Sequence, residues 1–322
     1  MKPCVAVTRR LPEVVETELA QDFDVRLNSP DITFEPSRLA ALLYEADGIL
    51  CTVTDRFDGS MLSAGSLRTK ILANFGVGYD NIETEAARAA GLVVTNTPDV
   101  LTEDTADLAV ALMLAVARRV GEGERMVRSG EWHGWGPTQL LGTRVHGKTL
   151  GIVGLGRIGH AVARRAAVGF HMRILCHTRH PPDRETLDSL GAEYCADLDD
   201  LLARSDFVSV HTPATPETRH LIDSRRFATM RQSAFLINTA RGDIVDERAL
   251  IEALSTRQIS GAGLDVYEQE PSIARGLLEL DNVVLLPHLG SATVQSRVAM
   301  GRRATENLRA FFAGRPPPDL IT

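Results

Sequence analysis

The chain has 322 residues, of which 44% are hydrophobic, and a formal net charge of −7. This length suggests about two domains, and the hydrophobic content is high enough for packed cores rather than a disordered chain. The negative charge argues against a nucleic-acid partner, which would favour a basic face.

The first hundred residues alternate between short β-rich runs and helical patterns. Helices are predicted at residues 36–45 and 83–90. Buried parallel strands are predicted at residues 4–8, 48–52, 70–74 and 92–95. This alternation indicates an open parallel sheet with helices on its faces.

A second series of elements begins near residue 100. Residues 104–120 predict a long buried helix, whereas residues 121–147, which are rich in glycine and contain both tryptophans, predict an extended arm. Further strands are predicted at residues 149–153, 173–177, 207–211, 234–238, 261–266 and 283–286, and helices at 160–168, 197–203 and 247–255. This is the pattern of a second doubly wound sheet.

A last helix is predicted at residues 296–314, after the second sheet is complete. We expect it to pack back on the first sheet, so that the chain crosses between domains near Pro98 and near Pro287. The predicted fold is therefore α/β, with one domain of residues 1–99 and 289–322, a second of residues 100–288, and a cleft between them.

Nothing in the sequence indicates a metal site, a disulfide framework or a membrane anchor. The four cysteines, at positions 4, 51, 176 and 195, lack C-x-x-C spacing and are expected to be reduced thiols. The longest strongly apolar run, residues 108–117, is too short for a bilayer span, which needs about 20 residues. The first ten residues lack the apolar segment of a secretion signal. We expect a cytoplasmic protein with no membrane partner.

A glycine fingerprint follows the predicted strand at 149–153 and precedes a predicted helix. Its residues are Gly154, Leu155, Gly156, Arg157, Ile158 and Gly159. In a dinucleotide site the first glycine permits a tight turn, the second lets the backbone approach a pyrophosphate, and the third allows close packing of helix on strand. A glycine-rich turn without a ligand is the alternative.

The end of the next strand indicates which dinucleotide is preferred. Dinucleotide sites for NAD place an acidic residue about 20 positions on, but this chain has Thr178, Arg179 and His180 there. An arginine can bind the 2′-phosphate of NADP, which a carboxylate would repel. We therefore predict a preference for NADPH, with NADH as the other usable cofactor. The alternative is that Arg179 is a solvated surface residue.

Three ionisable residues downstream, Arg241, Glu270 and His288, supply the groups needed to reduce a 2-keto acid. The guanidinium can hold a carboxylate, the imidazole can give a proton to the keto oxygen, and the glutamate can keep that imidazole charged and oriented. The residues leave alternatives open, because Arg241 could be a structural capping residue, and Glu270 could be a surface acid like Glu268, two positions away. The other eight histidines lack a comparable context.

The whole chain resembles the D-2-hydroxyacid dehydrogenases, most closely the glyoxylate/hydroxypyruvate reductases. The motifs that carry the resemblance are residues 76–82, 97–102, 153–159, 213–218, 237–242, 263–266 and 286–291. It implies a flavodoxin-like substrate domain and a Rossmann cofactor domain, with Arg241, Glu270 and His288 as the catalytic residues.

The resemblance also implies further site residues. It matches Val77 and Gly78 to a loop that holds the substrate carboxylate. It implies cofactor contacts at Thr105, Arg157, Ile158, Thr212, Pro213, Thr239, Asp265 and Gly290. Asp265 would meet the nicotinamide amide, although a strand-end acid can also be structural. Trp135, in the arm, matches a tryptophan that reaches a neighbour's substrate pocket in a homodimer; packing on its own subunit is the alternative.

The function expected from these observations is NADPH-dependent reduction of small 2-keto acids, namely glyoxylate to glycolate and hydroxypyruvate to D-glycerate. Larger keto sugar acids such as 2-ketogluconate are alternative substrates. An alternative of another class is a non-catalytic, NAD(H)-sensing corepressor-like protein, because such relatives of the fold can retain the three ionisable residues.

Overall fold

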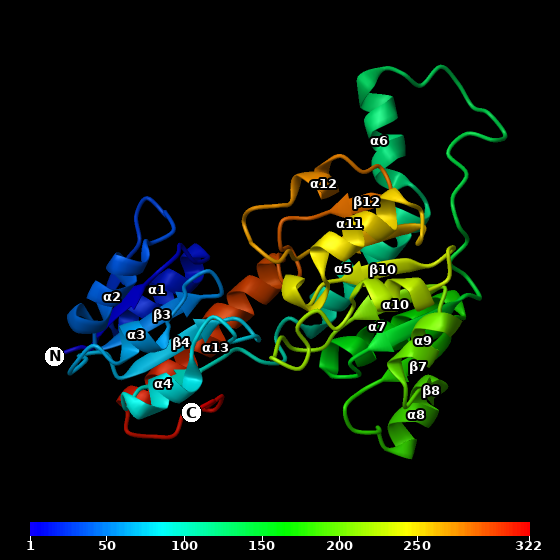
Figure 1. Cartoon of the computed structure of the whole chain (residues 1–322). Helices are drawn as coiled ribbons and strands as arrows, with labels where there is room; N and C mark the ends of the chain where they lie inside the picture. Colours follow the sequence, from blue (N-terminus) through cyan, green and yellow to red (C-terminus); the bar gives the residue numbers. More distant parts are fainter. The chain divides into compact units, whose positions relative to one another are not determined.

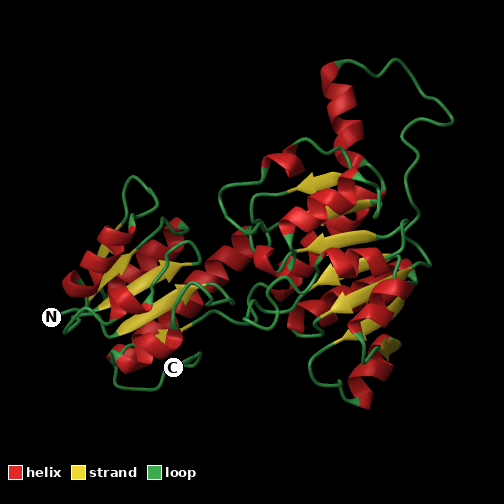
Figure 2. Ribbon diagram, in the orientation of Figure 1, coloured by secondary structure: helices red, strands yellow, loops and turns green.

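The computed structural model describes all 322 residues and divides the chain into two compact units. Unit 1 comprises Met1–Leu101 and Ser291–Thr322, and unit 2 comprises Thr102–Gly290. The domain limits expected from the sequence lie two residues from these bounds. In each unit, helices cover a sheet of strands, as Figure 2 shows in red and yellow.

Unit 1 contains a five-stranded parallel sheet in the order β2-β1-β3-β4-β5. Its elements are β1 (Cys4–Val7), α1 (Glu13–Asp22), β2 (Asp24–Leu27), α2 (Pro36–Glu45), β3 (Gly48–Thr52), α3 (Gly59–Leu62), β4 (Ile71–Phe75), α4 (Thr84–Ala89), β5 (Val93–Thr95) and the last helix of the chain, α13 (Val294–Phe312). This order is that of flavodoxin-like sheets. Helix α13 packs on β4, as the sequence predicts (Figure 1).

Unit 2 contains a seven-stranded parallel sheet in the order β12-β11-β10-β9-β6-β7-β8. Its elements are α5 (Thr102–Ala117), α6 (Val120–Ser129), β6 (Thr149–Val153), α7 (Arg157–Phe170), β7 (Arg173–His177), α8 (Arg184–Leu190), β8 (Ala192–Tyr194), α9 (Leu198–Arg204), β9 (Phe207–Val210), α10 (Ser224–Thr229), β10 (Phe235–Asn238), the 3₁₀ turn η1 (Gly242–Ile244), α11 (Glu247–Ser255), β11 (Gly261–Leu264), α12 (Arg275–Leu278) and β12 (Val283–Leu285). Starting from β6, this is the doubly wound order of dinucleotide-binding sheets. The predicted architecture of two doubly wound parallel sheets is confirmed.

The strands of unit 2 form because their side chains are apolar on both faces of the sheet. Strands β9 and β10 are buried along their whole length, as expected for parallel strands covered by helices on both sides. Aspartates cap the helices that follow; Asp246, for example, accepts a hydrogen bond from the N–H of Ala249 at the start of α11. Such a cap stabilises a helix by about 1 kcal/mol.

The structure corrects the prediction for residues 121–147. Their first part is helical, because α6 extends from Val120 to Ser129 and ends at Gly130, which has φ +77°. The helix buries none of its residues. Beyond Gly130 the chain is irregular, and Figure 1 shows α6 and this segment standing away from the sheet of unit 2.

The remaining general predictions concern thiols and membrane segments. All four cysteines are free and buried, as expected for reduced thiols. No helix combines the length and the apolar character that crossing a bilayer requires.

Candidate active site

The site residues predicted in unit 2 follow the carboxyl ends of neighbouring parallel strands. Gly154 follows β6, and its N–H donates to His177 O at the end of β7 (2.9 Å). On the other side, the N–H of His211, after β9, donates to Val153 O (2.7 Å). Strands β10, β11 and β12 continue this edge in the same register. The carboxyl edge of an open parallel sheet is where such folds bind their ligands.

The three fingerprint glycines differ in what surrounds them. A Cβ on Gly154, which has φ +95°, would lie 2.8 Å from the backbone of His211, and a Cβ on Gly159 would lie 2.1 Å from Gly154 O. Nothing lies within 4 Å of the corresponding position at Gly156. Gly156 is also the N-cap of α7, where no side chain caps the helix and the first turn carries no acid. The open space and the free helix end suit an anionic pyrophosphate.

The turn after β7 carries the residues predicted to choose the cofactor. Arg179 and His180 are exposed, and the hydroxyl of Thr178 donates to His180 O. A side-chain hydrogen bond from Thr215 lowers the pKa of Glu217, and the charge of Arg179 lowers it further. The positive charge of Arg179 therefore interacts electrostatically with the carboxylate of Glu217, in the turn after β9. The acidic residue typical of NAD sites is absent from the β7 turn itself.

The turns after β9 and β10 line the same edge. The backbone N of Thr212, which precedes Pro213, would lie 2.8 Å from a Cβ on Gly154, so the two turns are in close contact. Thr239, directly after β10, is 8% exposed, and its Oγ1 is buried without a hydrogen-bond partner. A buried hydroxyl without a partner is costly, and a ligand bound at this edge would provide one.

Arg241 lies on a loop that is fixed from within, residues 239–243, hereafter the Arg241 loop. Buried Asn238 donates from Nδ2 to Arg241 O (2.8 Å), and its Oδ1 accepts from the N–H of Ala240 (3.0 Å). Gly242 lies so close to the next loop that a Cβ there would be 1.9 Å from the carbonyl carbon of Tyr267. Only glycine fits this contact, which brings the loop after β10 against the loop after β11.

Glu270 and His288 are in direct contact. Nδ1 of His288 lies 2.7 Å from Oε2 of Glu270, and Oε1 of the same carboxylate accepts from the N–H of Tyr267 (3.0 Å). Burial raises the pKa of Glu270, but the hydrogen bond and charge of His288, with smaller effects of the Tyr267 N–H and Arg241, hold it below its ordinary value. The carboxylate is thus the stable form, and it leaves Nε2 of His288 as the ring nitrogen available to a substrate.

Asp265 organises the turn that carries His288. Its two carboxylate oxygens accept from the N–H groups of Leu289 (2.6 Å) and Gly290 (2.8 Å), and its carbonyl accepts from His288 N (3.0 Å). Burial raises the pKa of Asp265, against the effects of these N–H groups and of the His288 charge. Thr105, from α5, completes the group by donating to Gly290 O (3.0 Å). Three predicted cofactor residues, Thr105, Asp265 and Gly290, therefore lie together.

The sequence leaves open whether Glu268 or Glu270 is the functional acid and whether another histidine could replace His288, and the geometry bears on both questions. Glu268 is engaged elsewhere, because its Oε1 accepts from Glu247 N and lies 2.9 Å from Nε2 of His220. His211 also lies at the edge of the sheet, but burial lowers its pKa to about 4, so its imidazole is neutral at pH 7. Of these groups, the Glu270–His288 pair has the geometry of an acid-supported proton donor.

Unit 1 carries the predicted carboxylate loop, Val77 and Gly78. The carbonyl of Gly78 accepts from Asn74 Nδ2 and that of Val77 from Asn96 Nδ2, at 2.8 Å each. These amides fix the loop through its carbonyl groups, and the two peptide N–H groups donate to no protein atom. Backbone N–H groups held in this way are suited to an anion.

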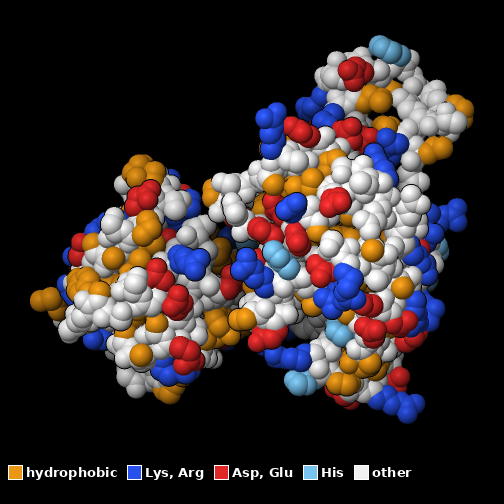
Figure 3. Space-filling model, viewed as in Figure 1, with side chains coloured by type: hydrophobic (Ala, Val, Ile, Leu, Met, Phe, Trp, Pro, Cys, Tyr) orange, Lys and Arg blue, Asp and Glu red, His pale blue; other side chains and the backbone are white.

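The arm of unit 2 exposes apolar side chains. Trp135 is 83% exposed, and Val127, Trp132 and Leu141 are exposed as well. Figure 3 shows hydrophobic side chains on this arm, and others are spread over the rest of the visible face among acidic and basic side chains.

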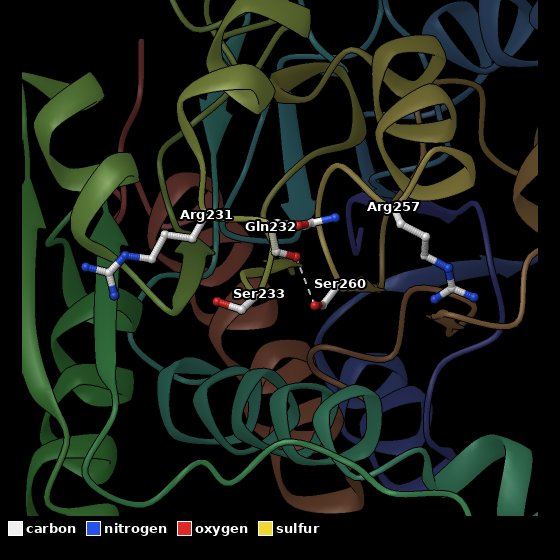
Figure 4. A pocket seen from close by; sticks show the side chains of 5 residues that line it. All are labelled: Arg231, Gln232, Ser233, Arg257 and Ser260. Atoms are coloured by element: carbon white, nitrogen blue, oxygen red, sulfur yellow. Dashed lines mark hydrogen bonds between the residues drawn. The ribbon is translucent and has the colours of Figure 1, made fainter.

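A surface cavity lies elsewhere in unit 2. It is a shallow depression of about 630 Å³ beside the amino ends of β10 and β11, lined by Arg231, Gln232, Ser233, Arg257 and Ser260. Figure 4 shows the two arginines pointing away from its centre in opposite directions. It is at the wrong end of the strands for the site described above.

The fold, and the residues at the carboxyl edge of the unit 2 sheet, define a class of protein: a dinucleotide-binding α/β enzyme with an acid–imidazole pair. Comparison with known proteins gives the family. The profile described as "D-isomer specific 2-hydroxyacid dehydrogenase, NAD binding domain" matches residues 110–290. The chain belongs to this family of NAD(P)-dependent oxidoreductases, so the resemblance seen in the sequence is confirmed.

Relatives match over the full length. The chain is 46% identical to a glyoxylate reductase of Pyrococcus horikoshii, covering 100% of this chain and 96% of the relative. It is also 46% identical to a glyoxylate reductase of Thermococcus litoralis, covering 100% and 97%. Among solved structures, an NADPH-dependent glyoxylate/hydroxypyruvate reductase of Sinorhizobium meliloti, in complex with NADP and malonate, matches with a TM-score of 0.88 at 35% identity, covering 100% and 97%.

Proposed function

We propose that this protein reduces small 2-keto acids, with glyoxylate and hydroxypyruvate as substrates and NADPH as the preferred cofactor. The observation that carries the proposal is the 2.7 Å contact between His288 and Glu270, beside the Arg241 loop. The names of the full-length relatives and of the Sinorhizobium meliloti structure support the choice of substrates.

The carboxyl edge of unit 2 would hold the dinucleotide. Gly156 and the start of α7 suit the pyrophosphate, and Thr239 Oγ1 needs a partner that a ligand can give. The carboxylate of Asp265 already accepts two N–H groups but has lone pairs left for the nicotinamide amide. When bound, the reduced nicotinamide supplies the hydride for the keto carbon.

The residues of unit 2 would then bind and protonate the keto acid. Arg241 offers a planar guanidinium for the substrate carboxylate and for the polarised keto oxygen. His288, protonated at both ring nitrogens, would give the proton on Nε2 to that oxygen, while Nδ1 stays bound to Glu270. We assign the free peptide N–H groups of Val77 and Gly78 to the substrate carboxylate as well.

The NADPH preference rests on the turn after β7. Arg179 can bind a 2′-phosphate, and Thr178 can donate to it if its hydroxyl turns away from His180 O. Glu217, on which the charge of Arg179 acts, would compete with the phosphate for the guanidinium. Use of NADH at lower efficiency is therefore part of the proposal.

We also propose that the protein is a homodimer, with the exposed arm between residues 130 and 147 reaching the neighbouring copy. The exposure of Trp135 supports an interface role for it.

A substrate panel tests the proposed function. NADPH oxidation is measured with glyoxylate, hydroxypyruvate and 2-ketogluconate, and each is repeated with NADH. The expected result is the highest kcat/KM for glyoxylate or hydroxypyruvate with NADPH. Better turnover of 2-ketogluconate would change the substrate class, and better kinetics with NADH would overturn the cofactor preference. Dinucleotide binding without turnover of any 2-keto acid would favour the corepressor-like alternative.

A further inference from the structure

One histidine, His220, touches the loop that carries Arg241 and the loop that carries Glu270. It lies in the turn before α10 and has the left-handed backbone angle φ +49°. Its N–H donates to Asp243 O on the Arg241 loop (2.7 Å). The contact continues next to it, where Ile222 N donates to Ile244 O (3.0 Å). The backbone of His220 is therefore attached to the loop after β10.

The side chain of His220 reaches the loop after β11, residues 265–271, hereafter the Glu270 loop. Its Nε2 lies 2.9 Å from Oε1 of Glu268, which also accepts from the N–H of Glu247 (3.0 Å). The N–H of Glu268 in turn donates to Oε2 of Glu247 (3.3 Å). Glu268 is thus held by hydrogen bonds at the start of α11. The imidazole of His220 lies within ion-pair distance of its carboxylate, although Nε2 makes no hydrogen bond.

These contacts act where the two loops are already in close approach. Gly242, next to Arg241, leaves no room for a Cβ against Tyr267 and Glu268. Two residues beyond Glu268 is Glu270, which binds His288. A small movement of Glu268 would therefore change the position of Glu270, and through Gly242 that of Arg241. A misplacement of about 1 Å in a reacting group can lower the rate by about 100-fold.

We propose that His220 and Glu268 are positioning residues, which hold the Arg241 loop and the Glu270 loop in a fixed relation. Neither residue is assigned contact with the substrate or the dinucleotide. This inference rests on the proposed function, because it gives the two residues a role in the same reaction. The imidazole–carboxylate contact makes the link between the loops, so the two residues should act as one unit.

A double-mutant cycle tests this coupling. The variants are His220→Ala, Glu268→Ala and the double variant, with Glu268→Gln as an isosteric second choice. We expect each single variant to lower kcat/KM for glyoxylate by about 10- to 100-fold, while Kd for NADPH changes less than about twofold. The double variant should be no worse than the more severe single variant, because both remove one contact. Additive losses, or unchanged kcat/KM in the single variants, would overturn the inference.

His171→Ala is the matched control. His171 is also a histidine with a left-handed backbone (φ +50°), and it precedes β7 at the opposite edge of the sheet. Replacing either histidine by alanine leaves a non-glycine residue with positive φ, so backbone strain is comparable. Only His220 touches the two loops, and His171→Ala should keep the kcat/KM of the wild type.

A spectroscopic readout separates this inference from the proposed function. The imidazole NMR signal of His288 is identified as the one lost in His288→Ala. It should shift in His220→Ala and in Glu268→Gln, because Glu270 moves, and remain in place in His171→Ala. This result does not require turnover. If the wild type reduced no keto acid but the signal shifted, the proposed function would fail and the positioning role would stand. An unmoved signal would overturn the positioning role even in an active enzyme.

Discussion

Nδ1 of His288 and Oε2 of Glu270 are 2.7 Å apart, which leaves Nε2 as the ring nitrogen that can face a substrate. If His288 is the proton donor, His288→Ala should lower kcat by about 100- to 10,000-fold. Kd for NADPH, measured by fluorescence titration, should stay within about twofold, because the imidazole is not assigned a dinucleotide contact. Retention of more than about a tenth of wild-type kcat would remove His288 from this role.

The same contact predicts a pH dependence of stability. The pKa of Glu270 is lowered in the folded protein, despite the opposing effect of burial. Its carboxylate therefore stabilises the fold at pH values above its unfolded pKa, and the contribution is lost as the pH falls through the folded pKa. Glu270→Gln should be less stable than the wild type at pH 7, and the difference should narrow as the pH falls below about 4. Urea unfolding at several pH values measures this; a difference independent of pH would contradict it.

The fingerprint glycines should respond differently to alanine. Gly156→Ala fills space that is open in the structure, so Tm should be unchanged while Kd for NADPH rises about tenfold or more. Gly159→Ala places a Cβ 2.1 Å from Gly154 O, so Tm should fall. Gly169→Ala, also in α7 with nothing within 4 Å, is the control and should leave Kd unchanged. An unchanged Kd in Gly156→Ala would argue against a pyrophosphate there.

Arg179 should determine the cofactor preference. Arg179→Ala is expected to raise KM for NADPH about tenfold or more, because a charged hydrogen bond to the 2′-phosphate contributes about 1.5–3 kcal/mol. KM for NADH should change little. Glu217→Gln, which removes the carboxylate on which Arg179 acts, should lower KM for NADPH. Equal effects of Arg179→Ala on both cofactors would make Arg179 an ordinary surface residue.

The Trp135→Ala variant tests whether Trp135 lines a neighbour's substrate pocket or only packs on its own subunit. If it lines a neighbour's substrate pocket, Trp135→Ala should raise KM for hydroxypyruvate more than KM for glyoxylate. Trp132, on the same arm and 52% exposed, is the control and should affect the two substrates equally. Sedimentation of both variants reports whether the dimer persists. Equal losses on both substrates for Trp135→Ala would assign it to packing alone.

The sequence predicts the two sheets and the edge at which the site lies because local patterns encode both. Buried parallel strands are nearly continuous apolar runs, and Arg241 and His288 are each the third residue after the end of such a strand. The missed strands β2 and β8 lie at sheet edges and contain no buried residue, so they lack that signal. Helix α6 likewise contains no buried residue.

Contacts between distant loops could not be predicted from the sequence. Asn238 is part of a motif, but its two hydrogen bonds within the Arg241 loop depend on the backbone of the turn. His220 and Glu268 meet only because β9, β10 and β11 are neighbours, and His220 therefore carried no sequence signal for a role in the site. Glu268 and Glu270 looked equivalent in the sequence, and their partners distinguish them in the structure.

Unit 1 is assembled from two segments that lie on either side of unit 2 in the chain. Helix α13 packs on β4, and Ile321 donates its N–H to the carbonyl of Val94 in β5. During synthesis, unit 2 emerges as one uninterrupted stretch and can fold when it is complete. The five-stranded sheet of unit 1 cannot be completed until the residues of unit 2, about 190 in number, have been translated. Until then, the face of the sheet that α13 covers stays exposed. The dinucleotide-binding unit can therefore complete its fold before the discontinuous unit whose segments flank it.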